Sequence, residues 1–371
     1  MKRRLLVAAT AITAIFAVSL VLALGVGEAA VRYRERHRTV VPGTTPTLYY
    51  RHARLRHALV RDFSYYGWAT VDSFGFRKTN GGGAPGSRRP SVLILGGSTT
   101  FDPQVSRDDH AWPARLETVL REGPSAFSGQ LINGGVPGYR MMDILIRLET
   151  ELGGFQPDLL LLYESHNDLY TALGPRPPRS FDPRPGRAIT RAPWTAWLEE
   201  HSLLYAKLAG RWQALRSRSG AEARSRIASA VPWDSILDAA AVSFERDVES
   251  IVAVAQARRI PVVLMTVTHV SAADSVVRDT AIARVWSYTV SGTPPDVVLE
   301  GYRRFADCLH RVAQRRGVPI IDGARSGVTG PEFYAEGDPI HFNDVGADRF
   351  AHYVASQLLP LVPRRANPLT R

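Results

Sequence analysis

The sequence contains a pair of residues whose spacing suits proton transfer, and a serine placed where a nucleophile could be presented. Asp338 and His341 stand three positions apart. A carboxylate at this spacing can reach the imidazole and hold it in the tautomer whose other nitrogen accepts a proton. Ser98 lies in the turn GGSTT (96–100), directly after an apolar run. A serine hydroxyl is a poor nucleophile unless a neighbouring base removes its proton. Taken separately, the serine segment also fits a structural or phosphate-binding turn, and the D-x-x-H segment fits a surface turn with an ordinary histidine.

Two further segments could stabilise negative charge beside that serine. NGGVPG (133–138) follows a second apolar run, and its glycines permit close approach of the backbone. By itself it is also compatible with a tight turn between a strand and a helix. ESHND (164–168) follows a third apolar run, and Asn167 can donate two N–H groups into a crevice. We interpret His166 as a wall residue of that crevice and Asp168 as a residue that caps or orients its neighbours.

A parallel sheet would bring these segments together, and the hydrophobic pattern predicts one. Five short apolar runs indicate buried strands, at 91–96, 130–133, 158–163, 261–267 and 318–322. Helical patterns lie between them, at 112–120, 141–152 and 244–258. This alternation predicts an α/β fold, a three-layer α/β/α sandwich around a five-stranded parallel sheet. In such sheets ligands bind beyond the carboxyl ends of the strands, where the loops meet.

The pattern of the first 30 residues is typical of a membrane anchor or a signal peptide. After Lys2, Arg3 and Arg4, residues 5–27 carry no charge, and these 23 residues are long enough, as a helix, to span a bilayer. The small residues Gly27 and Ala29 also permit cleavage as a secretory signal. We expect the rest of the chain to lie outside the cytoplasm, held at the cell membrane by a single span, or secreted or periplasmic if the signal is cleaved.

The remaining chain divides into two regions. Residues 31–90 are expected to connect and cap, and they include the flexible run GGGAPG (81–86). Residues 91–365 are expected to form the main domain, with a long insertion at about 174–235. Within the insertion, apolar side chains recur at helical spacing between Trp194 and Leu215. This pattern fits an amphipathic helix packed on the domain, a lid over the site or a patch that rests on a membrane.

The composition excludes several classes of protein. A chain of 371 residues that is 45% hydrophobic can bury a substantial core. Cys308 is the only cysteine, so the chain can form neither an intrachain disulfide nor a multi-cysteine metal centre. The net charge is +11, but almost all basic residues are scattered arginines, which argues against a nucleic-acid-binding track. No compact cluster of histidines and carboxylates suggests a metal, and we expect no cofactor.

In their order along the chain, the four segments resemble the sequence blocks of the SGNH hydrolase family, also called GDSL-type esterases, over about residues 91–360. The resemblance implies a flavodoxin-like fold and a catalytic triad of Ser98 as nucleophile, His341 as base and Asp338 as acid. It also implies an oxyanion hole that contains the backbone N–H of Gly135 and the side chain of Asn167.

The sequence departs from the family pattern at two positions. Gly97, rather than an aspartate, precedes the serine, and Ser165 stands where the third block usually has glycine. Neither departure removes a reacting group. Upstream, the segment DSFGFR (72–77) is similar to a segment that precedes this domain in membrane-anchored bacterial members, and we assign it no role.

The resemblance implies acyl transfer through a covalent acyl-enzyme intermediate. We therefore expect an extracytoplasmic serine ester hydrolase that acts on acyl or O-acetyl esters of small molecules, glycans or lipids. One alternative is an O-acyltransferase of envelope glycans, in which a sugar hydroxyl resolves the acyl-enzyme. A second alternative is a catalytically silent binding module of the cell envelope.

Overall fold

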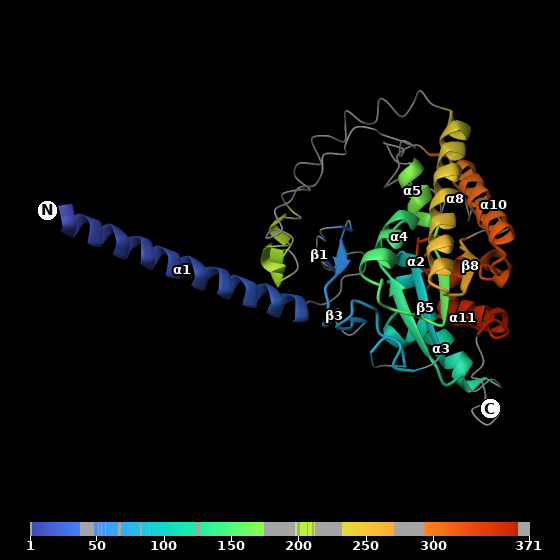
Figure 1. The fold of residues 1–371 in the computed structure, drawn as a ribbon, viewed down its shortest axis with the longest axis horizontal. Coiled ribbons are helices and arrows are strands. Elements are labelled where there is room, and N and C mark those ends of the chain that lie inside the picture. The colour runs from blue at the N-terminus through green and yellow to red at the C-terminus, as the bar shows by residue number, and fades with distance from the viewer. Residues whose placement is uncertain are drawn as a thin grey trace.

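A five-stranded parallel sheet forms the centre of the protein (Figure 1). The structure, a computed structural model, describes residues 2–37, 48–173, 232–270 and 293–362 with short gaps at 51, 53, 56, 66–67, 82–83, 89 and 124–126, and parts of 197–211. The strands are β5 (Ser91–Gly96), β6 (Gln130–Gly135), β7 (Leu159–Tyr163), β8 (Val262–Thr266) and β9 (Ile320–Asp322). They pair in the order β6-β5-β7-β8-β9, all in parallel. The predicted α/β fold is confirmed.

The three central strands β5, β7 and β8 are buried along their whole length, as their uninterrupted apolar sequences predict. Alternate side chains of each strand enter two separate cores, because successive residues of a strand point to opposite faces of the sheet. In β5, for example, Leu93 and Leu95 belong to one core, whereas Val92 and Ile94 belong to the other. The side chains of each apolar run therefore pack against helices on both faces of the sheet.

Helices cover both faces of the sheet and complete the three layers. On one face lie α4 (Met141–Thr150), α5 (His166–Leu173), α8 (Trp233–Ala257) and α10 (Pro295–Arg316). On the other face lie α3 (Trp112–Glu122) and α11 (Asp344–Leu358), which pack against each other through residues that include Trp112 and Phe350. The helix predicted at 244–258 begins earlier, at Trp233.

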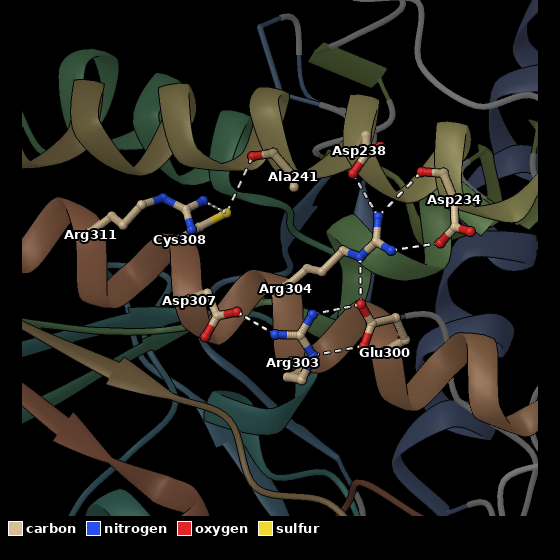
Figure 2. Close-up of polar contacts among 9 residues, drawn as sticks. All are labelled: Asp234, Asp238, Ala241, Glu300, Arg303, Arg304, Asp307, Cys308 and Arg311. Atoms are coloured by element: carbon tan, nitrogen blue, oxygen red, sulfur yellow. Dashed lines mark hydrogen bonds and ion pairs between the residues drawn. The ribbon is translucent and has the colours of Figure 1, made fainter.

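Ion pairs join the outer surfaces of α8 and α10 (Figure 2). Arg304 of α10 lies at the centre of one group: its guanidinium is 2.6 Å from Asp234 and from Asp238 of α8, and 2.7 Å from Glu300. Further along the two helices, Arg311 bonds to Glu245. These contacts link the exposed surfaces of two helices whose buried faces pack in the same apolar core, and exposed pairs of this kind contribute little stability individually.

The N-terminal helix α1 (Lys2–His37) projects away from the sheet domain (Figure 1). Within it, the stretch Thr13–Arg34 is long and apolar enough to cross a membrane, and none of its side chains is buried. The helix runs past residue 30, where the sequence placed the end of the anchor, and an i,i+4 pair between Glu28 and Arg32 stabilises this extension.

Two small antiparallel hairpins form the region between α1 and the sheet. They are β1 (Tyr49–Tyr50) with β2 (Ala58–Leu59), and β3 (Phe63–Tyr65) with β4 (Ala69–Val71). Beyond them, Arg77 pairs with Asn133 of β6, so this region is fastened to the edge of the parallel sheet. Most of the predicted insertion at 174–235 lies outside the described residues, including Trp194, Trp212 and Leu215, while the described parts of 197–211 are largely helical.

Candidate active site

Ser98 stands at the carboxyl end of the central strand β5, as the sequence predicted. The short helix α2 (Ser98–Phe101) begins at this serine, so the chain must reverse its course within Gly96 and Gly97. A side chain on Gly96 would overlap Thr100 and the carbonyl of Tyr163, and therefore only glycine fits. The Thr100 hydroxyl donates to that same carbonyl at 2.9 Å and ties α2 to β7. The turn presents the serine in a fixed place.

Asp338, His341 and Ser98 form a continuous hydrogen-bonded row. Nε2 of His341 lies 2.8 Å from Oγ of Ser98, and Nδ1 of His341 lies 2.6 Å from Oδ2 of Asp338. The second carboxylate oxygen of Asp338, Oδ1, accepts the backbone N–H groups of Ile340 and His341, both at 3.0 Å. The structure thus brings together residues that are 243 positions apart in the sequence, in the geometry that proton transfer from the serine hydroxyl requires.

The loop that carries Asp338 and His341 is fastened on both sides. It lies between the 3-10 turn η4 (Pro331–Phe333) and α11. The side-chain amide of Asn343 donates to the carbonyls of Glu332 and Tyr334, and its oxygen accepts the N–H of Gly346 as the N-cap of α11. The position of the His341 imidazole therefore depends on these bonds within the loop as well as on its own contact with Ser98.

The charge states of Asp338 and His341 suit His341 to act as a general base. Burial alone would raise the pKa of Asp338, but the neighbouring His341 and two backbone N–H groups lower it to about 2, so this group is a carboxylate. For His341, burial lowers the pKa, but the Asp338 carboxylate outweighs it and raises the pKa above the ordinary histidine value. An imidazole of raised pKa that is hydrogen-bonded to a hydroxyl can accept its proton and then return it.

Asn167 lies in the first turn of α5, beside the turn at Gly96 and Gly97 that precedes Ser98. Its side-chain Nδ2 donates to the carbonyl of Tyr139 at 2.9 Å, which fixes the direction of the amide. A side chain on Gly97 would overlap this nitrogen, so the amide lies directly against the residue that precedes Ser98. Nδ2 carries two hydrogens, and the second is shared with the buried carboxyl group of Glu164.

Gly135 occupies the end of β6, next to the end of β5, but its N–H already has a partner. It donates to Oδ1 of Asn133 at 3.0 Å. A side chain on Gly135 would overlap the backbone of Phe101, which explains the need for glycine at this position. The structure therefore places Gly135 against α2 with its N–H bonded to Asn133, and its part in an oxyanion hole stays a prediction.

His166 forms part of a wall of neutral rings next to the row. Its Nδ1 lies 2.5 Å from the hydroxyl of Tyr302, and its ring stacks over that tyrosine. Burial, reinforced by the charge of His341, lowers the pKa of His166 to about 3, so it is a neutral wall residue, as interpreted from the sequence. His269 also stacks on Tyr302, with ring centroids 4.5 Å apart. Asp168 accepts the backbone N–H of Met141 at 2.9 Å and orients the start of α4.

Arg77 holds the end of α2, the short helix that begins at Ser98, and the sequence did not reveal this contact. The fully buried guanidinium donates to the carbonyls of Phe101 and Asp102, at 2.7 and 2.5 Å, where α2 ends. It also bonds to Asp108 at 3.0 Å. Asp102 is itself buried, and burial raises its pKa to about 7 despite a hydrogen bond from Trp112 and the charge of Arg77. The DSFGFR segment, to which no role was assigned, thus supplies the residue that holds the serine helix in place.

The chain matches the family model of the GDSL-like lipase/acylhydrolase family over residues 94–349. Within the described residues, no group of three or more His, Cys, Asp or Glu side chains could hold a metal ion. The fold and the match define an acylhydrolase of the three-layer α/β class. The chain belongs to the GDSL-like lipase/acylhydrolase family, and it is a carboxylic ester hydrolase.

Several solved structures are similar to this chain at low sequence identity. One is a lipolytic protein of the G-D-S-L family from Desulfitobacterium hafniense, at 11% identity over 72% of this chain and 99% of that chain, with a TM-score of 0.40. An acetyl xylan esterase aligns at 13% identity over 74% and 100%, with a TM-score of 0.41. A variant of an acetyl-xylooligosaccharide esterase from Geobacillus Stearmophilus aligns at 11% identity over 76% and 99%, with a TM-score of 0.43. Among curated proteins, no sequence match is found.

Proposed function

We propose that the protein is an extracytoplasmic serine esterase that cleaves acyl or O-acetyl esters through a Ser98 acyl-enzyme. The observation that supports this proposal is the hydrogen-bonded row from Asp338 through His341 to Ser98. His341 takes the hydroxyl proton as Oγ bonds to the ester carbonyl carbon, and it gives that proton to the leaving alcohol as the ester C–O bond breaks. Water then attacks the acyl-enzyme with His341 again as base, releasing the carboxylic acid and restoring Ser98.

In this proposal the negative oxygen of each tetrahedral intermediate is met by N–H donors around the serine turn. The Asn167 amide supplies one: Tyr139 holds one of its hydrogens, and the other, shared with Glu164 in this structure, turns to the oxyanion. The backbone N–H of Ser98 at the start of α2 supplies a second donor. The backbone N–H of Gly135 is the third donor that the sequence predicted. It has to share its hydrogen with Oδ1 of Asn133 to take part.

Labelling with a fluorophosphonate tests the nucleophile directly. The probe is expected to modify wild-type protein on Ser98, and p-nitrophenyl acetate is expected to be hydrolysed. The Ser98→Ala variant should fold as the wild type does but show neither reaction. Labelling that persists in this variant would refute the assignment of the nucleophile. Products are also analysed with and without a carbohydrate acceptor. If the acceptor, instead of water, receives the acyl group, the reaction is acyl transfer and not hydrolysis.

We also propose that α1 is retained as a membrane anchor, with the catalytic domain outside the cytoplasm. Glu28, in the last part of the apolar helix, accepts the backbone N–H groups of Leu203 and Leu204, both at 2.9 Å, and the hydroxyl of Ser202 at 2.8 Å. Arg32 donates to the carbonyl of His201 at 3.0 Å. Cleavage between Gly27 and Ala29 would cut the chain within this contact, so the contact supports a helix that stays attached.

The N-terminal mass of the protein purified from membranes tests retention. A retained anchor gives the full-length mass and partition into the membrane fraction, with protease access to the catalytic domain from outside the cell. A mature N-terminus near residue 28 and a soluble protein would overturn this part of the proposal.

A further inference from the structure

The hairpin of β1 and β2 precedes the stretch that matches the family, yet it packs into the same core as the sheet. The family match begins at residue 94, whereas this hairpin spans residues 49–59 and stands between α1 and the sheet domain (Figure 1). Its side chains Leu55 and Leu59 are buried in the core that also contains Val136 and Tyr139. The hairpin is therefore built into the fold that carries the candidate site.

His57, directly before β2, contacts the loop that follows β6. Its Nε2 lies 2.8 Å from the carbonyl oxygen of Pro137, and because a carbonyl only accepts, the ring is the donor. The hydroxyl of Tyr139 donates in turn to the backbone carbonyl of His57 at 2.6 Å, and the two rings meet edge to face. Gly138 has a φ of +83°, and a Cβ there would lie 3.4 Å from the His57 ring. Two hydrogen bonds and a close ring contact thus fasten residues 137–139 to His57.

The same loop connects the nucleophile turn to the amide of Asn167. At its start, the backbone N–H of Val136 donates to the carbonyl of Gly96 at 3.0 Å. At its end, the carbonyl of Tyr139 accepts a hydrogen of Asn167 Nδ2 at 2.9 Å. A shift of residues 137–139 would therefore move the acceptor that directs the Asn167 amide, while the other end of the loop stays bonded to the nucleophile turn. The direction of that amide depends on a contact made by the hairpin.

We propose that His57 is a positioning residue for the esterase reaction: it holds the loop at residues 137–139, so that Tyr139 directs the Asn167 amide toward the oxyanion. This inference rests on the proposed function of Ser98 and Asn167. It makes the hairpin before the family-matched stretch a part of the catalytic unit. His57 acts through the loop and not on the proton of the serine, so its loss should lower turnover without moving the acid limb that His341 sets.

A double-mutant cycle with Asn167 tests whether His57 acts through that amide. His57→Ala removes the bond to Pro137, and kcat should fall by about 5–30-fold with little change in KM, because a misdirected donor loses part of the effect of an oxyanion donor. In the Asn167→Ala background the same substitution should lower kcat by less than about twofold, since the amide is no longer there to be directed. His57→Gln, whose side chain can donate an N–H to Pro137, should recover most of the lost kcat.

His52→Ala is the matched control, because His52 lies in the same hairpin and bonds to the N–H groups of Arg54 and Leu55 and to Glu151. It should leave kcat within about twofold of the wild type. Hydrogen–deuterium exchange of the full-length protein in detergent gives a readout that does not depend on turnover. Peptides that contain residues 134–141 should exchange faster in His57→Ala than in the wild type or His52→Ala.

Three results would overturn the inference: a folded His57→Ala enzyme within twofold of wild-type kcat, an equal loss of kcat in both backgrounds, or unchanged exchange of residues 134–141. If His57→Ala does not fold, Tyr139→Phe makes the same comparison, because it removes only the hydroxyl that bonds to His57. If the wild type neither turns over esters nor reacts with the probe, the proposed function fails, and the exchange rates still decide whether His57 holds the loop.

Discussion

Replacing Asp338 by asparagine tests whether the hydrogen bonds of its carboxyl group fix the tautomer of His341. In the structure Oδ1 accepts two backbone N–H groups, those of Ile340 and His341. The carbonyl oxygen of an asparagine must take this place, since an NH2 group there would face two donors. The NH2 group is then left beside Nδ1 of His341, where Oδ2 now lies at 2.6 Å. It can only donate, so Nδ1 must accept and the ring proton moves to Nε2.

An imidazole with its proton on Nε2 presents a donor to Oγ of Ser98 and cannot act as its base. The 2.8 Å contact between these atoms survives, but the proton cannot be transferred. We expect kcat to fall by about 10³–10⁴-fold, equivalent to a barrier higher by about 4–5.5 kcal/mol. The variant should remain folded, because the replacement keeps the size and both backbone hydrogen bonds.

The assay compares initial rates on p-nitrophenyl acetate and the rate of fluorophosphonate labelling, with a circular dichroism melt for each protein. Asp322→Asn is the matched control: Asp322 bonds to the hydroxyl of Thr266 and not to a histidine. It should keep kcat within about twofold of the wild type, as substitutions away from a site usually do. A folded Asp338→Asn enzyme within tenfold of wild-type kcat would refute the tautomer argument.

Four further outcomes are expected. Asn167→Ala should lower kcat by about 10²–10³-fold with a much smaller change in KM, as measured by steady-state kinetics, and a rise in KM alone would contradict its role. The acid limb of kcat/KM should fall through a pKa above the ordinary histidine value, because His341 works unprotonated and its pKa is raised; the pH profile of Asp338→Asn should move to lower pH. Gly97→Ala should slow probe labelling by about tenfold or more, because the new methyl group displaces Glu164 and Asn167. Unchanged labelling would show that the turn can move to accommodate the methyl group. Arg304→Gln should lower the free energy of unfolding by less than about 1 kcal/mol in urea titrations, a loss that high salt reduces.

The sequence predicted the parts of this fold that depend on local pattern. Uninterrupted apolar runs are typical of strands buried on both faces, and all five predicted strands are present in the sheet. The turn before Ser98 and the D-x-x-H segment were equally visible, because glycine at a sharp turn and a carboxylate three residues from an imidazole are local signals. The rule that parallel strands bring their carboxyl ends to one edge accounts for the closeness of the segments that carry Ser98, Gly135 and Asn167. It does not account for the D-x-x-H loop, which η4 and α11 hold beside Ser98.

What the tertiary structure alone decided is which polar groups meet inside the protein and in what state of charge. The sequence analysis noted the segments of Arg77 and Glu164 but gave neither residue a role, yet both are buried against the turn and the short helix that carry Ser98. The N–H of Gly135 is paired with Asn133, and no spacing in the sequence shows this. Burial and the direction of a hydrogen bond depend on residues brought together from distant parts of the chain, and these determine whether a carboxyl such as Asp338 or Glu164 is ionised.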